Sequence, residues 1–325
     1  MDRRQHLGAL LAAAASATLP LAARAQAYPN KPIRAIVPFA PGGTTDIIAR
    51  IVAERMNATI GQNMIVENRA GGGGTVGTLE VVRAAPDGYV LGLGTVSSTA
   101  ANPAINPRIA YDPLVDLTAI TNIAATPNVI AVHPSFPAKD FRTFVDVLRK
   151  NPGKFSYASS GTGGNNHLLM ELFKVISKTF VLHIPYRGSG PAIIDTVAGV
   201  IPILFDNLPS SLPFIRDGRL VPIVVAAPSR LSVLPNVPTF AEMGMEPVNR
   251  MAYYGFVGPK GLPSEIVNRI YNATRTVVQD AGVRKRIEDT GSVILANSPA
   301  EFSAQIRAEL EVFRRVVREQ KLTLE

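Results

Sequence analysis

Four glycine-rich loops carry the clearest chemistry in the sequence. Each is expected to follow a strand and to open a helix, and the four span residues 39–46, 68–75, 159–164 and 186–191. The first backbone N–H groups of a helix lack partners and lie at the positive end of the helix dipole, so such a loop can bind an anion without lysine or arginine. In open α/β sheets, ligands also bind at this end of the strands. Because two loops come from each half of the chain, the pattern predicts an acid held between two lobes.

A glycine-rich loop between a strand and a helix can also be no more than a tight connection. Four of them on the same side of their sheets favour a binding site instead. The run of four glycines at 71–74 could suggest a nucleotide, but the sequence does not contain G-x-x-x-x-G-K-[ST]. Nucleotide binding is therefore not expected.

Three polar residues lie near these loops. Asp206 ends an apolar strand, where its carboxylate can face the cleft or cap the helix that begins near Pro209, and the sequence leaves both alternatives open. His167, in the first turn of its helix, can orient a ligand or form a hydrogen bond within its own loop. Together with Ser160 these residues could suggest a hydrolase triad, but no G-x-S-x-G motif shapes a nucleophile. We therefore do not expect an enzyme.

The composition excludes several other kinds of chemistry. The chain has 325 residues, of which 46% are hydrophobic and 18% charged, so it can bury the core of a folded protein. It has no cysteine, which excludes disulfides, thiolate metal sites and cysteine nucleophiles, and its four histidines are scattered. We expect no metal and no cofactor. The net charge of +8 is not gathered into basic clusters with interleaved aromatic residues, so no nucleic-acid partner is expected.

The first 25 residues have the pattern of a secretory signal peptide. Two arginines follow Met1, an apolar run spans residues 7–23, and an Ala-x-Ala site ends at Ala25, with a second at Ala27. The run is too short and too rich in alanine for a membrane anchor. The arginine pair could mark a twin-arginine signal, but His6 stands where that signal has an apolar residue, so the general secretory route is favoured. Cleavage after Ala25 removes three arginines and one aspartate and lowers the net charge from +8 to about +6.

Apolar strands and helical patterns alternate along the rest of the chain. Continuously apolar short strands between helices predict mostly parallel sheets that are covered on both faces. A first α/β series begins at Ile33 and a second after Ala131. At the C-terminal end, a serine-to-glutamate capping pattern at 298–301 starts an amphipathic helix that needs the first lobe's core. We therefore expect one lobe from residues 26–127 and 250–325 and another from 128–249, joined by two crossing segments.

Seven segments in this order closely resemble the Bug family, the periplasmic solute-binding receptors of tripartite tricarboxylate transporters. The segments are YPNKPIR at 28–34, VPFAPGG at 37–43, ENRAGG at 67–72, PDGY at 86–89, PYRGSGP at 185–191, VPTFAEMG at 237–244 and GPKGLP at 258–263. The resemblance spans essentially the whole mature chain. One departure is that the family often has tryptophan on the returning segment, where this chain offers Tyr253 or Tyr254.

The resemblance implies a two-lobed periplasmic-binding-protein type II fold, the Venus flytrap, with a small carboxylated ligand between the lobes. Backbone amides and ordered water would hold the ligand, and Asp206 would accept a hydrogen bond from an amino, hydroxyl or water group. The expected ligand-binding residues are Phe39, Ala40, Gly42, Gly43, Thr44, Gly71, Gly73 and Thr75 in the first lobe and Ser159, Ser160, Gly161, Thr162, Gly163, Tyr186, Gly188 and Asp206 in the second. His167 and Ser97 are further candidates.

The resemblance also implies a function. We expect an exported, monomeric binding protein that captures an organic acid or amino acid and delivers it to the membrane permease of a tripartite tricarboxylate transporter. The alternative is a sensor that presents its closed, ligand-bound form to a signalling partner. The loops predict a general carboxylate site, so the choice of acid depends on side chains in the cleft.

Overall fold

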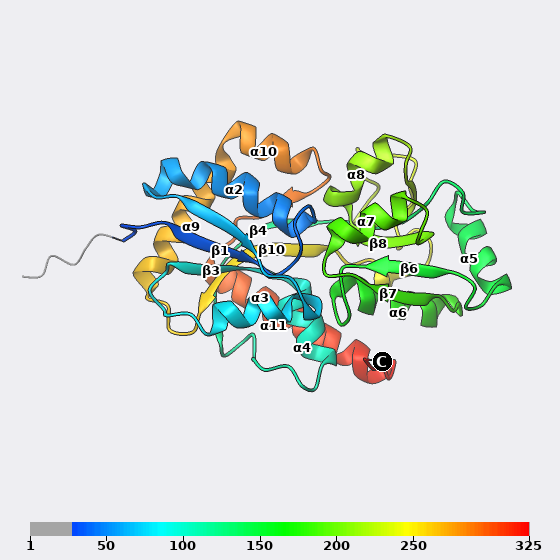
Figure 1. Ribbon diagram of the computed structural model, residues 1–325, viewed down its shortest axis with the longest axis horizontal. Helices are drawn as coiled ribbons and strands as arrows, with labels where there is room; N and C mark the ends of the chain where they lie inside the picture. The colour runs from blue at the N-terminus through cyan, green and yellow to red at the C-terminus, as the bar shows by residue number, and fades with distance from the viewer. Residues whose placement is uncertain (1–27, 325) are drawn as a thin grey trace, which may run out of the picture.

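A computed structural model describes residues 28–324 and shows two α/β lobes side by side (Figure 1). The expected signal peptide, residues 1–25, lies outside the described residues. In Figure 1 the first lobe contains the blue and cyan segments together with the orange ones from late in the sequence, and the second lobe is green. The chain therefore leaves the first lobe and later returns to it.

The first lobe is built on a six-stranded sheet in the order β11-β4-β10-β3-β1-β2. Its strands are β1 (Ile33–Val37), β2 (Met64–Asn68), β3 (Val90–Thr95), β4 (Leu117–Thr126), β10 (Ala252–Pro259) and β11 (Val293–Ile294). Its helices are α2 (Thr44–Ile60), α3 (Thr75–Val82), α4 (Asn102–Ile105), α9 (Ser264–Gln279), α10 (Ala281–Glu288) and α11 (Pro299–Glu319). A short 3₁₀ turn, η1 (Gly72–Gly74), and a π-helical segment, η2 (Ser97–Ala101), follow β2 and β3.

The second lobe is built on a five-stranded sheet in the order β7-β6-β8-β5-β9. Its strands are β5 (Asn128–Val132), β6 (Ser156–Ser159), β7 (Leu182–Pro185), β8 (Ile203–Asn207) and β9 (Val221–Ala226). Its helices are α5 (Phe141–Lys150), α6 (Asn165–Ser177), α7 (Ser189–Val197) and α8 (Leu208–Arg216), and the 3₁₀ turn η3 (Glu246–Val248) precedes the return to the first lobe.

Both sheets are mixed, which corrects the expectation of mostly parallel sheets. β1 pairs in parallel with β2 and β3, and β6 pairs in parallel with β7 and β8. The strands by which the chain enters a lobe from a crossing run the other way: β10 is antiparallel to β3 and β4, and β5 is antiparallel to β8 and β9. The reason is topological, because a strand that enters a lobe from the crossing side runs opposite to the strands that end at the cleft.

Two segments connect the lobes at their centre. β4 ends at Thr126 in the first sheet, and after Pro127 the chain continues as β5 in the second sheet. The return leads from η3 into β10. The side chain of Asn128 donates a hydrogen bond of 2.6 Å from Nδ2 to the carbonyl oxygen of Arg250, so the two crossings are tied together.

The helix α2 shows why the sequence folds locally as it does. Ile48, Val52 and Met56 follow one another at four-residue spacing and are all fully buried against the sheet. Gly61 ends the helix with a φ of 79°, a left-handed conformation that glycine adopts without strain. This helix carries the first glycine-rich loop at its N-terminal end.

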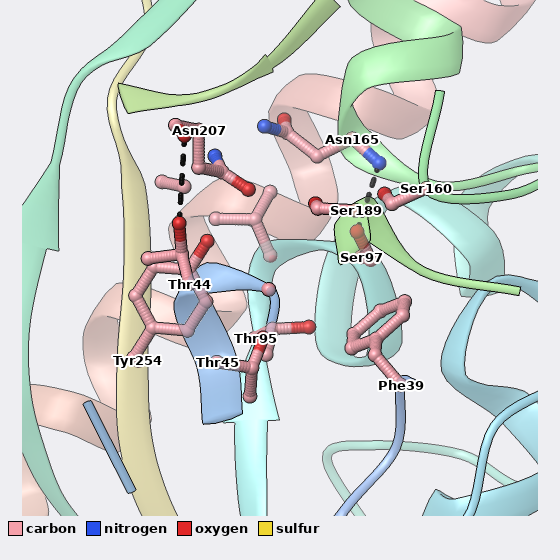
Figure 2. Close-up of a pocket in the computed structure, with 13 residues that line it drawn as sticks. Phe39, Thr44, Thr45, Thr95, Ser97, Ser160, Asn165, Ser189, Asn207 and Tyr254 are labelled. Carbon is pink, nitrogen blue, oxygen red and sulfur yellow. Dashed lines mark hydrogen bonds between the residues drawn. The ribbon is translucent and has the colours of Figure 1, made fainter. Parts of the chain in front are cut away.

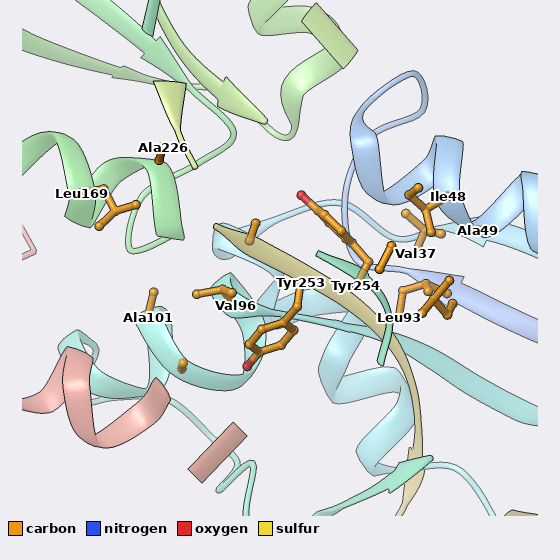
Figure 3. Packing of buried hydrophobic residues seen from close by; sticks show 14 of the residues in the cluster. Val37, Ile48, Ala49, Leu93, Val96, Ala101, Leu169, Ala226, Tyr253 and Tyr254 are labelled. Atoms are coloured by element: carbon orange, nitrogen blue, oxygen red, sulfur yellow. The ribbon is translucent and has the colours of Figure 1, made fainter. Parts of the chain in front are cut away.

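The apolar core is continuous from one lobe to the other (Figure 3). Val37, Ile48 and Leu93 belong to the first lobe, and Leu169 and Ala226 extend the same cluster into the second. Figure 3 shows that Tyr253 and Tyr254 point to opposite faces of β10. Consecutive residues of a strand face opposite ways, so one tyrosine enters the core and the other faces the junction between the lobes.

The C-terminal helix α11 has the predicted capping box, which is confirmed. Ser298 Oγ accepts a hydrogen bond from the Glu301 backbone N–H, and the Glu301 side chain accepts one from the Ser298 backbone. Its apolar stripe, Phe302, Ile306 and Leu310, is buried against the first lobe, where the helix contacts β4 and η2. The first lobe is therefore completed by chain from both ends of the described sequence.

Candidate functional site

A small cavity lies between the lobes, at the ends of strands and the starts of helices (Figure 2). Its volume is about 20 Å³, which leaves space for roughly one water molecule. The lining residues are Phe39, Gly43, Thr44, Thr45, Thr95, Val96, Ser97, Ser160, Asn165, Ser189, Asn207, Ala252 and Tyr254. None of the described residues that line it carries a formal charge, so the polar surface of the cavity consists of hydroxyl, amide and backbone groups.

Several helix starts meet at this cavity. Thr44, Asn165 and Ser189 are the first residues of α2, α6 and α7, and Asn207 directly precedes α8. The residues just before the first three helices are glycines, and none of them caps its helix through a side chain. The positive ends of these helix dipoles therefore point toward the cavity, which suits a carboxylate better than a cation.

The loop before α2 is held in shape by Asp46, a residue that the sequence reasoning did not single out. Its carboxylate accepts hydrogen bonds from the Gly42 backbone N–H at 3.1 Å and from Asn68 Nδ2 at 2.9 Å, and it pairs with Arg50 at 3.0 Å. Burial acts to raise the pKa of Asp46, but these donors together hold the pKa below its usual value. Because the Gly42 backbone N–H already donates a hydrogen bond to Asp46, it is not available to a ligand.

The lobes touch each other around the cavity through three sets of hydrogen bonds. The Ala40 backbone N–H donates to the Arg187 carbonyl oxygen at 3.1 Å. The Asn165 backbone N–H donates to Ser97 Oγ at 3.0 Å. Thr44 Oγ1 lies 2.9 Å from Ser210 Oγ. The structure is therefore a closed form, and a solute reaches the cavity only when the lobes separate.

Glycines make this closure possible. A Cβ atom built on Gly73 would lie 2.4 Å from the Thr162 carbonyl oxygen, and one on Gly190 would lie 2.3 Å from the Pro41 carbonyl oxygen. A Cβ on Gly188 would lie 2.7 Å from the Ala40 backbone nitrogen. All three contacts join one lobe to the other, and no side chain fits at such distances. These glycines let backbone meet backbone where the lobes touch, and the expected role of Gly73 and Gly188 in binding a carboxylate stays a prediction.

Asp206 lies behind the cavity wall and is not among the residues that line it. It is 1% exposed, and its carboxylate accepts hydrogen bonds from the hydroxyls of Ser189, Ser210 and Ser211 at 2.5, 2.7 and 2.7 Å. Burial raises the pKa of Asp206, and these hydroxyls act in the opposite direction. Ser210 and Ser211 belong to the first turn of α8, so the structure favours the alternative in which Asp206 serves the start of that helix.

His167 also lies behind the site, against His183. Its Nδ1 accepts a hydrogen bond of 3.0 Å from the Gly163 backbone N–H, and its ring stacks on that of His183 at a centroid distance of 4.0 Å. His183 Nε2 lies 2.7 Å from Ser159 Oγ. Burial lowers the pKa of His167 to about 4 and the pKa of His183 to about 3, so both rings are neutral at pH 7. The pair supports the 159–164 loop and does not contact the cavity.

The structure thus divides the sixteen expected ligand-binding residues and the two further candidates. Phe39, Gly43, Thr44, Ser160 and Ser97 line the cavity. Ala40, Gly42, Gly73, Gly161, Thr162, Gly163 and Gly188 lie where the lobes meet. The others form contacts within their own loops or in the interior of their lobe: Gly71, Thr75, Ser159, Tyr186, His167 and Asp206.

Eight lining residues were missed by the sequence reasoning. Four of them had a signal: Thr45 and Ser189 are inside recognised loops, Asn207 follows Asp206 directly, and Tyr254 occupies the segment where the family often has tryptophan. The others are Thr95, Val96, Asn165 and Ala252. Among residues 28–324, no group of three or more His, Asp or Glu side chains is placed to hold a metal ion.

Two sheets joined by two crossings, with helix starts around a cavity between them, define a two-lobed solute-binding protein. Comparisons with known proteins identify the family. Residues 48–322 match the model of the tripartite tricarboxylate transporter family receptor, TctC. The chain is 32% identical to BugT of Bordetella pertussis over 296 residues, which cover 91% of each chain. The chain therefore belongs to the TctC family, which includes the Bug proteins, and its predicted membership of that family is confirmed.

Solved structures agree with this assignment. A periplasmic transporter matches with a TM-score of 0.91 and 48% identity over 92% of this chain and 100% of its own. Two Rhodopseudomonas palustris proteins also match. MatC with bound malate has a TM-score of 0.86 and 30% identity, and the match covers 89% of this chain and 100% of MatC. A protein solved with adipate has a TM-score of 0.87 and 29% identity, and the match covers 91% of this chain and 99% of that protein. Members of the family are periplasmic solute-binding receptors and not enzymes, which confirms the expectation that the chain is not an enzyme. Within residues 28–324, no helix is long and apolar enough to cross a membrane.

The glycine contacts give a direct test of closure. Gly190 is the second residue of α7 and has no positive φ, so alanine there suits the helix but collides with Pro41 when the lobes close. We expect Gly190→Ala to weaken ligand binding by about tenfold or more and to increase the radius of gyration measured by small-angle scattering. Gly282→Ala changes the second residue of α10, away from the cleft, and is the matched control. If both variants have the same ligand affinity and the same radius of gyration, closure does not require a glycine at position 190.

The histidine pair predicts a loss of stability in acid. Both folded pKa values lie below the ordinary value of 6.5, so the unfolded chain takes up protons first and the contribution of the pair is lost as the pH falls below about 6.5. We expect His167→Asn, which can still accept the Gly163 hydrogen bond, to lose less Tm between pH 6.5 and 4.5 than the wild type. His133→Asn removes a partly exposed histidine and should keep the wild-type profile. Parallel profiles for all three proteins would contradict this role.

Proposed function

We propose that this protein captures a small carboxylated solute between its lobes and delivers it to the permease of a tripartite tricarboxylate transporter. Membership of the receptor family and the malate and adipate bound by two relatives support this proposal. The observation that carries it is the cavity itself, where the starts of α2, α6 and α7 meet without a charged side chain. A carboxylate is the common small anion that such a neutral, donor-rich site can hold.

The energetics are compatible with this proposal. A receptor with micromolar affinity needs about 8 kcal/mol of binding free energy. Hydrogen bonds to a charged group contribute roughly 1.5–3 kcal/mol each. A few backbone N–H groups from the helix starts, together with the hydroxyls of Thr45 and Ser97, are sufficient even after the cost of closing the lobes. An arginine is not required.

Closure is part of the proposed mechanism. The solute enters when the lobes separate, and the contacts of Ala40, Thr44 and Ser97 with the other lobe form as they close. We assign residues 26–127 and 250–325 to the first lobe and residues 128–249 to the second. The closed form then excludes water from the ligand and presents a defined surface to the permease.

Location and export belong to the same proposal. We propose that residues 1–25 are a signal peptide removed on export by the general secretory route, and that the mature protein works as a monomer in the periplasm. Solved structures of similar proteins that are described as periplasmic support this location. A freely diffusing monomer can carry its solute from the outer region of the periplasm to the membrane.

A thermal-shift titration tests the function. We expect at least one mono-, di- or tricarboxylate from a panel to raise the Tm of the mature protein in a concentration-dependent manner, because a ligand that binds only the folded form stabilises it. Esters and amides of the same acid are the matched controls and should give no shift. If no carboxylate stabilises the protein and its neutral derivatives do, the proposed function is wrong.

A further inference from the structure

The side chain of Asn128 orients three other asparagines at the cleft. Asn128 is fully buried, and its Nδ2 donates to the Arg250 carbonyl oxygen, which can only accept. The amide of Asn128 is therefore fixed, with Oδ1 as its acceptor. This oxygen lies 3.4 Å from Nδ2 of Asn165, 3.1 Å from Nδ2 of Asn166 and 2.5 Å from Nδ2 of Asn207.

Asn165 consequently leaves an acceptor without a partner at the cavity. Its Nδ2 faces Asn128, and its Oδ1 has no hydrogen-bond partner among the described residues, although the residue is only 2% exposed. Asn165 is also one of the residues that line the cavity (Figure 2). A buried acceptor without a donor is costly, so this oxygen favours a solute that brings a hydrogen-bond donor next to Asn165 when the lobes close around it.

Ser189 presents a second acceptor on the same side. Its hydroxyl hydrogen is spent on Asp206, whose carboxylate receives three serine hydroxyls and the Asn207 backbone N–H. These four donors match the roughly four acceptor sites of an ionised carboxylate. Ser189 lines the cavity, so its oxygen can offer only lone pairs there. Asp206 thus orients the Ser189 hydroxyl so that its hydrogen points away from the cavity and its oxygen can accept a hydrogen bond there.

We propose that the natural solute carries a hydroxyl or amino group in addition to its carboxylate, and that this donor binds at Asn165 Oδ1 and Ser189 Oγ in the second lobe. An ammonium can donate to both oxygens, and a hydroxyl to one of them. This inference rests on the proposed function and names its substrate class as hydroxy or amino carboxylates. The family does not decide the matter, since malate has a hydroxyl group and adipate has none. The preference of this chain for a hydroxy or amino acid is inferred from its own cavity residues, Asn165 and Ser189.

The consequence is discrimination against plain acids. When the lobes close on an acid without a donor, both acceptors stay buried and unpaired. When they close on an amino acid of the same length, the ammonium can donate to both acceptors, and the hydroxyl of a hydroxy acid can donate to one of them. A site built around a polar group rejects an analogue that lacks it far more strongly than it rejects a change in apolar size.

Calorimetric titration with matched triplets tests this inference. The triplets are propionate, lactate and alanine; succinate, malate and aspartate; and glutarate, 2-hydroxyglutarate and glutamate. In any triplet that binds, we expect the hydroxy or amino member to bind about tenfold tighter, or more, than the plain acid. The better of the two donor-bearing members identifies the donor as hydroxyl or ammonium.

Two matched pairs of variants locate the effect. Ser189→Ala and Ser211→Ala each remove one hydroxyl from Asp206, but only Ser189 lines the cavity. Likewise, Asn165→Ala and Asn166→Ala each remove one amide from Asn128, but only Asn165 lines the cavity. We expect Ser189→Ala and Asn165→Ala to reduce the preference for the donor-bearing acid to about threefold or less, and the two control variants to keep it.

The possible failures are distinguishable. If the plain acids bind as tightly as their hydroxy and amino partners, this inference is overturned while the proposed function stands. If the preference exists but survives both Ser189→Ala and Asn165→Ala, the assignment of the two acceptors is overturned. If no carboxylate in any triplet binds to the wild-type protein, the proposed function fails and this inference fails with it.

Discussion

Closure of this protein depends on backbone meeting backbone where the lobes touch. Gly73 lies against Thr162, and Gly190 lies against Pro41, at distances that leave no room for a side chain. This constraint explains the small volume of the cavity and the short side chains around it. None of the described residues that line the cavity is an arginine or lysine, so recognition falls to helix starts, hydroxyls and amides.

Buried residues that do not line the cavity orient the polar groups that do. Asp206 fixes the direction of the serine hydroxyls, and Asn128 fixes the direction of the asparagine amides, although neither lines the cavity. The histidine pair supports the adjacent loop in the same manner. Such buried networks pre-orient the groups that face a ligand, which lowers the cost of binding because little remains to be ordered. A buried carboxylate is tolerated here because hydroxyl and amide donors, and not a cation, satisfy it.

The sequence predicted much of the fold and part of the site. The capped start of α11 was predicted, since the serine-to-glutamate pattern at 298–301 and the apolar spacing after it are local signals. The antiparallel course of β10 was not predicted, because strand direction depends on how the chain returns to its first lobe. The four loops were placed correctly, but the role of Gly190 depends on Pro41, which lies in the other lobe. The orientation of Asn165 depends on Asn128, 37 residues earlier, and no local pattern reveals such a contact.

The central claim is that a carboxylate binds between the lobes on helix starts and without a cationic side chain. A crystal structure of the mature protein with the acid that stabilises it most tests this claim directly. We expect the acid in the cavity between Thr44 and Asn165, with its carboxylate accepting hydrogen bonds from backbone N–H groups and hydroxyls. An acid bound outside this cavity, or a carboxylate paired with a lysine or arginine side chain, would contradict it.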